Sequence, residues 1–342
     1  MVALYILLAL FVFGVMILVH ELGHFVFAKI FKVAINEFSI GMGPKIFSKK
    51  LKDGVQYSLR AFPIGGFVAM EGETEESENP NSFDKKPAYQ RFIIVSAGAI
   101  VNIIVAIIIV FFLSVTSPYF GTTTIASFDG GAGSFQGLYE NDVVISVDGE
   151  KVTTVDELSY AIMMRGNKPI DIIVNRGGEE VLVKGVTFPT IEKDGFVYGD
   201  MNFKVFGEKR TFGSVIKNTY HTSLSTVRMI WDSIIGLITG KFGFKQISGP
   251  VGVTGAMVDV ARKDGLRSFL FLVSVISMNL GVFNLLPIPA LDGGTLLFTG
   301  IEMIFRKRIP RKIEDTLKLV VFALLILLVI AVSIKDVIML II

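Results

Sequence analysis

The apolar run of residues 2–28 contains the sequence His20-Glu21-Leu22-Gly23-His24 close to its end. On a helix, two histidines four positions apart lie on one face, at the spacing that holds a zinc ion. The glutamate between them is placed to take a proton from an attacking water molecule. Such side chains are costly inside a membrane-spanning helix, so they indicate function there. These residues predict a zinc-dependent hydrolytic site within a membrane span.

Two simpler interpretations of the same run have to be weighed. HExxH occurs by chance in helices, and an apolar run of this kind can be a signal peptide. The second is disfavoured because no basic region precedes the run and no small-residue cleavage site follows it.

Apolar residues gather in four long segments, at residues 2–28, 92–115, 269–305 and 319–342. Each is long enough to cross a bilayer, which takes about 20 helical residues. The third is longer than needed and is interrupted by Pro287 and Pro289. Broken helices at membrane depth are tolerated where they line a cavity. With 51% hydrophobic residues overall, the chain is predicted to be a polytopic α-helical membrane protein with four transmembrane helices.

The chain has no cysteine, which excludes disulfides and thiolate metal sites. Any zinc must therefore be held by histidine and carboxylate. The net charge of +2 gives no indication of a nucleic-acid partner, and we expect none.

Positive charge is concentrated in two of the connecting segments. Residues 29–91 carry ten Lys and Arg, and residues 306–318 carry six. The positive-inside rule places both segments in the cytoplasm and residues 116–268 on the outer side. His20 then lies ~27 Å along its helix from Val2, near the cytoplasmic side of the bilayer.

Residues 33–70 alternate short apolar stretches with glycine and proline, which predicts short strands and tight turns. The acidic run of residues 71–78 is most simply a solvated loop. Residues 212–240 show helical apolar spacing interrupted by charges, and this predicts an amphipathic helix on the outer membrane surface. His221 in this stretch is expected to be a surface residue.

Residues 122–188 have the pattern of a small α+β domain. Strands are predicted at residues 143–147, 170–174 and 181–186, with a helix at 155–164. The stretch of residues 137–149 resembles a PDZ domain of the bacterial protease-associated type, although Asn141 stands where the usual form has glycine. PDZ domains typically add a peptide strand to a sheet edge. Peptide binding and a role as a size filter or spacer both remain open.

The third apolar segment contains Asp292, and an aspartate within an apolar helix requires a partner. A hydrolytic zinc site typically has three protein ligands and one open position. Two histidines on another span lack one ligand, and Asp292 supplies the missing carboxylate. The alternative is a buried aspartate that binds a helix end.

HExxH in the first span and NxxPxPxLDGG in a later one resemble the paired motifs of the site-2 protease family of intramembrane zinc metalloproteases. One PDZ domain between the second and third spans makes the chain similar to the RseP-type bacterial members. The resemblance implies His20, His24 and Asp292 as Zn²⁺ ligands and Glu21 as catalytic acid and base. It also implies residues that help to position substrate, namely Asn279, Asn284, Pro287 and Pro289, with Gly98 and Asn102 of a GxxxN element and Gly41 and Gly43 of a re-entrant GxGP loop. Ala99 and Thr295 depart from the usual motifs, but neither is needed as a ligand.

The expected fold is four transmembrane helices with a re-entrant β element and an inserted α+β PDZ domain. Residues 1–115 hold the first two spans, 116–190 the extracytoplasmic PDZ domain, 191–268 a linker with amphipathic membrane-surface helices, and 269–342 the last two spans. The resemblance implies a multi-pass protein of the bacterial inner (cytoplasmic) membrane that cuts the transmembrane segments of single-span proteins, such as anti-sigma factors or remnant signal peptides. A non-catalytic membrane scaffold and a zinc transporter are the competing hypotheses.

Overall fold

The computed structural model describes residues 2–193, 196–241, 243–244 and 247–341, and the chain divides into two compact units. The first unit comprises Met1–Ile109 and Gly243–Ile342, and the second comprises Val110–Phe242. The outermost positions of the predicted ranges, Met1 and Ile342, fall outside the described residues.

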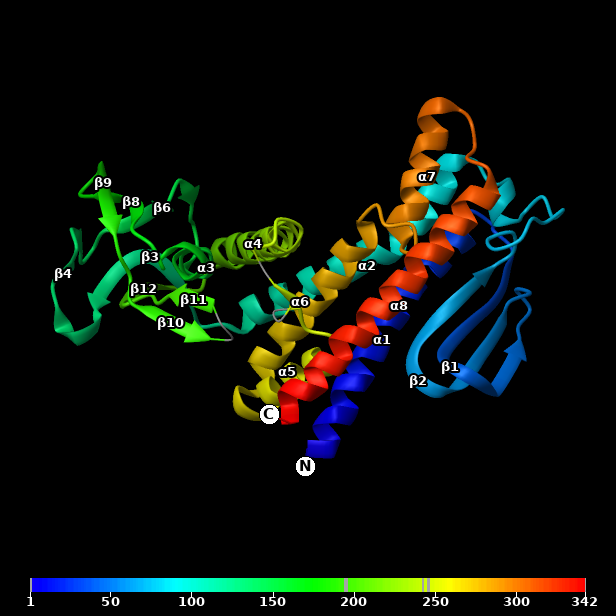
Figure 1. The fold of residues 1–342 in the computed structure, drawn as a ribbon, viewed down its shortest axis with the longest axis horizontal. Coiled ribbons are helices and arrows are strands. Elements are labelled where there is room, and N and C mark those ends of the chain that lie inside the picture. The colour runs from blue at the N-terminus through cyan, green and yellow to red at the C-terminus, as the bar shows by residue number, and fades with distance from the viewer. Residues whose placement is uncertain (1, 194–195, 242, 245–246, 342) are drawn as a thin grey trace. The chain divides into compact units, whose positions relative to one another are not determined.

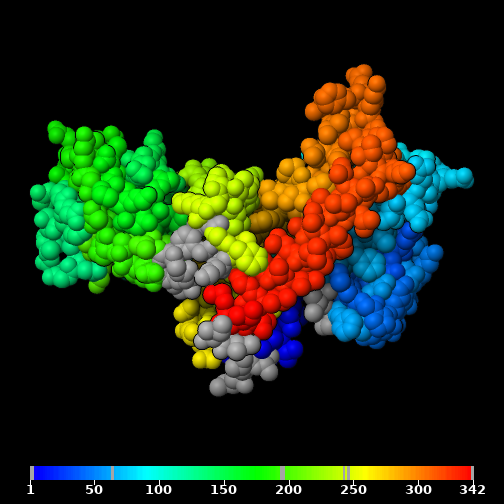
Figure 2. All heavy atoms as spheres, viewed as in Figure 1, coloured from blue at the N-terminus to red at the C-terminus, as the bar shows by residue number. Residues whose placement is uncertain are grey.

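The first unit is mainly helical (Figure 1). Its helices are α1 (Val2–Ile30), α2 (Ala88–Thr116, which continues into the second unit), α5 (Pro250–Lys263), α6 (Gly265–Leu285), α7 (Asp292–Phe305) and α8 (Arg311–Ile341). Four of them, α1, α2, α6 and α8, are long and apolar enough to cross a membrane, as the sequence predicts. Figure 2 shows α8 in red along the surface of this unit. Its side chains there are largely exposed and apolar, including Leu319, Phe322 and Leu327, which suits a lipid-facing helix.

The third apolar segment forms two helices with a break at its two prolines, as the sequence predicts. α6 ends at Leu285 and α7 begins at Asp292, because Pro287 and Pro289 lack the N–H groups that a continuous helix requires. The two glycines after Asp292 allow the chain to double back closely. A Cβ on Gly293 would lie 1.9 Å from the carbonyl oxygen of Leu286. The break therefore places Asp292 in the first turn of a new helix.

The predicted strands of residues 33–70 form the hairpin of β1 (Ile35–Lys50) and β2 (Gln56–Met70), followed by a short 3-10 helix at Phe83–Lys85. Both strands are irregular, and Phe38 of β1 has Val68 on one side and Tyr57 on the other. The end of β2 around Val68 is therefore an edge of this small sheet. Apolar side chains of the hairpin pack with residues of α1, α2 and α7, including Ala28, Ile94 and Leu296.

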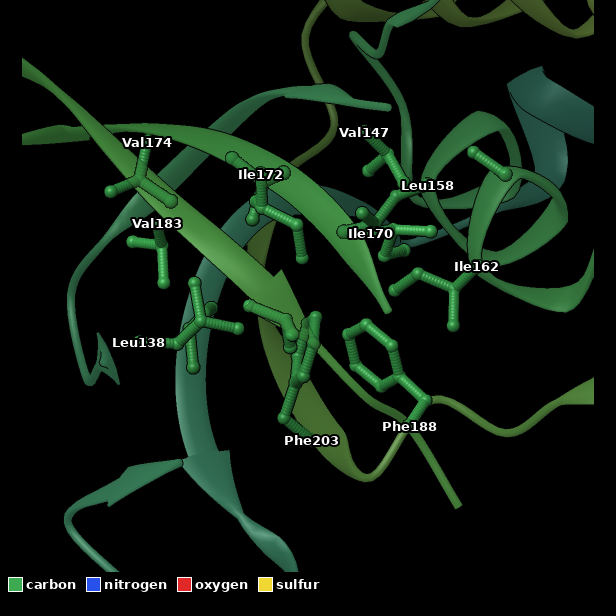
Figure 3. Packing of buried hydrophobic residues seen from close by; sticks show 14 of the residues in the cluster. Leu138, Val147, Leu158, Ile162, Ile170, Ile172, Val174, Val183, Phe188 and Phe203 are labelled. Carbon is green, nitrogen blue, oxygen red and sulfur yellow. The ribbon is translucent and has the colours of Figure 1, made fainter. Parts of the chain in front are cut away.

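The second unit has a sheet with the strand order β12-β3-β6-β8-β9, and β7 pairs with β6. These strands are β3 (Tyr119–Phe128), β6 (Val143–Val147), β7 (Glu150–Lys151), β8 (Ile170–Arg176), β9 (Glu179–Val186) and β12 (Phe203–Lys209). Leu158 and Ile162 of α3 (Val155–Arg165) pack with Ile172 and Val174 of the sheet in one buried core (Figure 3). The strands and helix predicted within residues 122–188 are all present.

Other elements, among them one long helix, complete the second unit. They are a 3-10 turn at Asp129–Gly131, β4 (Ser134–Phe135), β5 (Leu138–Tyr139), β10 (Thr190–Lys193), β11 (Phe196–Gly199) and the helix α4 (Phe212–Ile238). The tight turn between β6 and β7 has positive φ at Asp148 and Gly149, as a two-residue hairpin requires.

Two parts of the predicted linker, residues 191–268, differ from expectation. β12 pairs with β3, so the sheet extends beyond residue 190. α5 belongs to the first unit, where Met257 is fully buried in a cluster with residues of α1 and α6, so this helix packs against those helices through that residue. Both arrangements depend on partners far away in the sequence, which local apolar spacing does not reveal.

Candidate active site and metal centre

The two histidines of the HExxH sequence lie one turn apart on α1, and both are buried, with 7% of each residue exposed. Their Nε2 atoms are 3.1 Å apart, and the rings meet edge to face. Four-residue spacing on a helix produces this geometry directly. Both Nε2 atoms are therefore directed at one point.

Asp292 reaches the same point from the start of α7. Its Oδ2 atom lies 3.0 Å from Nε2 of His20 and 3.2 Å from Nε2 of His24. Within the described part of the chain, this oxygen is buried and makes no hydrogen bond. The three ligand atoms all lie within 4.8 Å of one another. A buried carboxylate oxygen facing two imidazole nitrogens is best compensated by a cation, and two histidines with one carboxylate fit zinc with one position open.

α2 packs against the two imidazole rings of His20 and His24. Nδ1 of His24 is 2.9 Å from the carbonyl oxygen of Ile94, an acceptor that requires a proton on Nδ1 and so leaves Nε2 free to bind metal. Close packing depends on two glycines. A Cβ on Gly23 would lie 2.6 Å from the carbonyl oxygen of Ala97, and one on Gly98 would lie 2.4 Å from Nε2 of His24.

Glu21 lies between the two histidines and is half-buried. Its Oε2 atom accepts a hydrogen bond of 3.1 Å from the backbone N–H of Val68, at the edge of β2. The carboxylate is thereby held beside the metal-binding residues without belonging to the set of three ligand atoms. This arrangement suits a group that moves protons.

A cavity of about 280 Å³ adjoins the site and is lined by Glu21, His24 and Asp292. The rest of the lining combines charged and apolar side chains, and one charged pair, Arg91 and Glu302, forms an ion pair of 2.5 Å. Polar and charged walls at this position allow water to reach the carboxylates. The cavity therefore has room for the water molecule that hydrolysis requires.

The other residues expected to position substrate fall into three groups. Gly98 and Asn102 lie behind the histidines on α2, and Asn102 is fully buried, so it is shielded from direct substrate contact. Asn279 and Asn284 lie in the last turns of α6, and Pro287 and Pro289 lie in the break before Asp292; none of the four is fully buried. Gly41 and Gly43 lie on β1 beside Phe62, and both have positive φ.

Sequence reasoning missed Glu73, which it placed in a solvated acidic loop. Glu73 lines the cavity with Glu21, and its Oε2 atom is 3.4 Å from the N–H of Met70, two residues along β2 from the donor to Glu21. The Glu73 side chain is exposed to the cavity. The many protein atoms around its carboxyl group still displace part of the solvent, and this desolvation raises the pKa of that group. Only the folding of residue 73 back against β2 distinguishes it from its acidic neighbours.

Comparison with known proteins agrees with this geometry. The model of Peptidase family M50 matches residues 8–328, so the chain belongs to this family, the site-2 proteases. It is a zinc metalloprotease with Zn²⁺ as its cofactor.

Its relatives match over nearly their whole length. A Clostridium perfringens protein with a zinc metalloprotease name is 35% identical, over 98% of this chain and 99% of the relative. "Zinc metalloprotease RasP" of Geobacillus kaustophilus and "Regulator of sigma-W protease RasP" of Bacillus subtilis are each 29% identical, over 95% of this chain and 96% of each relative.

Proposed function

We propose that this zinc metalloprotease is an intramembrane endopeptidase that cuts the transmembrane segments of single-span membrane proteins. The observation that carries the proposal is the convergence of His20, His24 and Asp292 at a helix long enough to span a membrane. A soluble protease would have no reason to build its metal site on such a helix, because polar side chains there are costly.

The proposed ligands are His20 Nε2, His24 Nε2 and Asp292 Oδ2. A zinc ion held by three protein ligands lowers the pKa of water to about 7 and polarises a carbonyl group. Glu21 is the proposed acid and base: it takes the proton of the attacking water and later returns it to the leaving amine. The Val68 N–H that bonds Glu21 Oε2 orients the carboxylate for both transfers.

A helical substrate hides its peptide carbonyls in hydrogen bonds, so it has to unwind before it can be cut. The edge of β2 near Val68 lies next to Glu21 and offers a place where an extended segment can add as a strand. Asn279, Asn284, Pro287 and Pro289, at the break between α6 and α7, are proposed to bind the freed backbone. Gly41 and Gly43 shape the re-entrant hairpin of which this edge is part.

We place the protein in the bacterial inner membrane with the loops rich in Lys and Arg in the cytoplasm. The sheet of the second unit is then an extracytoplasmic PDZ domain. Anti-sigma factors and remnant signal peptides are the proposed substrates, and the name of the Bacillus subtilis relative, which refers to sigma-W, supports the first class.

The experiment uses purified protein in liposomes that also contain a tagged single-span substrate. We expect wild type to cut within the transmembrane segment and phenanthroline to stop it. Glu21→Gln should reduce cleavage by about 10²–10⁴-fold while zinc content stays at the wild-type level. His20→Ala, His24→Ala and Asp292→Ala should each lose both zinc and activity, and Glu75→Gln, an exposed residue, serves as the control.

Each competing function has its own signature in this experiment. Substantial turnover by Glu21→Gln would refute the assigned acid and base. Zinc bound without any cleavage would indicate a scaffold, and zinc flux into the liposomes without cleavage would indicate a transporter.

A further inference from the structure

Asn102 is a polar residue at the centre of the first unit, on α2, with none of its surface exposed. Its Nδ2 atom is 3.3 Å from Nδ1 of His20. Within the described residues, its Oδ1 atom is buried and has no hydrogen-bond partner. A buried carboxamide with an unpaired oxygen is costly, so its place beside a metal-binding histidine calls for an explanation.

The chemistry of the neighbouring ring decides which carboxamide atom belongs against His20. When Nε2 of a neutral imidazole binds a metal, Nδ1 carries the proton and needs an acceptor. Nδ2 of Asn102 cannot accept, whereas Oδ1 can. The two orientations of a carboxamide have the same shape and are distinguished by their hydrogen bonds. A half-turn of the Asn102 amide therefore places its unpaired oxygen on the Nδ1 proton of His20.

His24 shows the same arrangement already complete. Its Nδ1 meets the carbonyl oxygen of Ile94 at 2.9 Å. Ile94 and Asn102 are eight residues apart, two turns of α2, and Gly98 lies midway between them, where a side chain would collide with both rings. One face of α2 thus offers an acceptor to each histidine, and the missing side chain of Gly98 leaves room for both rings.

The position of Asn102 is fixed by helix α6. Ser277 of α6 donates a hydrogen bond of 2.9 Å to the backbone carbonyl oxygen of Asn102. α6 and α2 also approach closely at Gly281 of α6. A Cβ on this glycine would lie only 2.8 Å from the carbonyl oxygen of Ala99 on α2. α6 therefore holds this part of α2, and with it the carboxamide, against α1.

We propose that Asn102 is a positioning residue whose carboxamide oxygen accepts the Nδ1 proton of His20 and so directs the Nε2 lone pair to zinc. The proposal rests on the ligand set of the proposed function. It assigns Asn102 to the metal site in place of the substrate contact that the GxxxN resemblance implies, because full burial keeps the side chain from any substrate.

The test compares three variants with wild type, all purified in detergent, by competition for zinc with a chelator of known affinity. Asn102→Leu keeps the size of the side chain but removes the acceptor, and it should weaken zinc binding about 10–100-fold. Asn102→Asp retains an acceptor oxygen and should bind zinc within a few-fold of wild type. Ser274→Ala, the matched control on α6, removes a hydroxyl that donates a hydrogen bond to the carbonyl oxygen of Phe271 and does not contact Asn102, so it should leave zinc affinity unchanged.

Thermal unfolding of each variant after zinc removal shows whether Asn102→Leu still folds. If it does not, the comparison of Asn102→Asp with wild type carries the test, and a large loss of zinc affinity in Asn102→Asp overturns the proposal. Wild-type affinity in a folded Asn102→Leu also overturns it. An increased KM for substrate at unchanged zinc affinity would assign Asn102 to substrate binding instead. All of these comparisons start from a wild type that binds zinc. A wild type that bound no zinc would instead show that the proposed function had failed.

Discussion

At the scale of single residues, Gly98 shows how closely the metal site is built. The ring atoms of both histidines occupy the space where its side chain would be: a Cβ would lie 2.4 Å from Nε2 of His24 and 2.9 Å from Cε1 of His20. Both rings are buried and fixed by their partners on α2, so neither can move aside without losing its hydrogen bond. The absence of a side chain at position 98 is thus part of the ligand geometry.

Gly98→Ala should therefore damage the zinc site although alanine favours the helix. We expect zinc affinity to fall about 10–100-fold, the range found when the surroundings of a metal ligand are disturbed. Gly300→Ala in α7 is the matched control, because nothing lies within 4 Å of its added Cβ. Chelator competition measures both. Equal zinc affinity of the two variants would show that α2 can shift away from α1 at no cost.

At the scale of elements, the start of α5 is held by a residue from a different helix. Oδ2 of Asp336, on α8, accepts hydrogen bonds of 2.8 Å from the N–H groups of Gly249 and Gly252. These are among the donors that the first turn of a helix leaves unpaired. Asp336, which also forms an ion pair of 3.0 Å with Lys335, thus joins α8 to α5, and its charge favours the N-terminal end of the helix dipole of α5.

Asp336→Ala should lower the free energy of unfolding by about 1–3 kcal/mol for each buried N–H group left unpaired. Thermal unfolding in detergent should therefore begin at a lower temperature. Asp259→Ala on α5 is the control, since its side chain is 60% exposed and its loss should cost less than about 0.5 kcal/mol. Equal melting temperatures for the two variants would mean that water or lipid headgroups replace the Asp336 carboxylate.

At the scale of the whole molecule, the two units are suited to different surroundings. The first has four helices suited to lipid, whereas the second has a sheet with its own buried core (Figure 3). The charge distribution predicts that this sheet lies on the outer side of the membrane. Accessibility to a reagent that cannot cross the membrane tests the orientation directly.

A single cysteine at Lys151, an exposed residue of β7, should react with an impermeant thiol reagent in intact cells. One at Glu76, exposed in the acidic loop, should react only after permeabilisation, because the positive-inside rule predicts that the segments rich in Lys and Arg lie in the cytoplasm. The chain has no cysteine of its own, so any label on this protein is on the introduced residue. The reverse pattern of labelling would place the second unit in the cytoplasm.

The structure also defines how the sheet can be removed to test its role. The N–H of Arg210 donates a 3.1 Å hydrogen bond to the carbonyl oxygen of Pro118, so the chain enters and leaves the sheet at one place. Deleting residues 119–209 with a short flexible bridge removes β3 and β12 together. A deletion of residues 122–188, the range indicated by the sequence, would leave β12 with only the first three residues of its partner strand.

If the sheet is a size filter, the 119–209 deletion should speed cleavage of substrates with large outer domains and leave trimmed substrates unchanged. Zinc content should stay at the wild-type level, because none of the metal-binding residues is removed. Initial rates for long and trimmed versions of one substrate, with each enzyme, give the measurement. Slower cleavage of the trimmed version by the deletion variant would show instead that the domain delivers substrate by binding a peptide end.

Sequence by itself determined the features that depend on local spacing. His20 and His24 share a helix face because they are four residues apart, and the four spans follow from the length of the apolar segments. The strand, turn and helix of residues 143–164 follow from apolar alternation and from the Asp148-Gly149 turn. These forces act between near neighbours, so the order of residues is sufficient to reveal them.

Only the tertiary structure decided which distant groups meet. Ile94 and Asn102 face the two imidazoles because α2 packs closely on α1 at Gly23 and Gly98. Glu73 lines the catalytic cavity while its acidic neighbours do not, and β12 completes a sheet that begins far earlier in the chain. None of these contacts has a local pattern, because each arises when separate elements bury their surfaces against one another. Sequence thus proposed His20, His24 and Asp292 as metal ligands, but packing determined that they meet and what holds the two histidines in place.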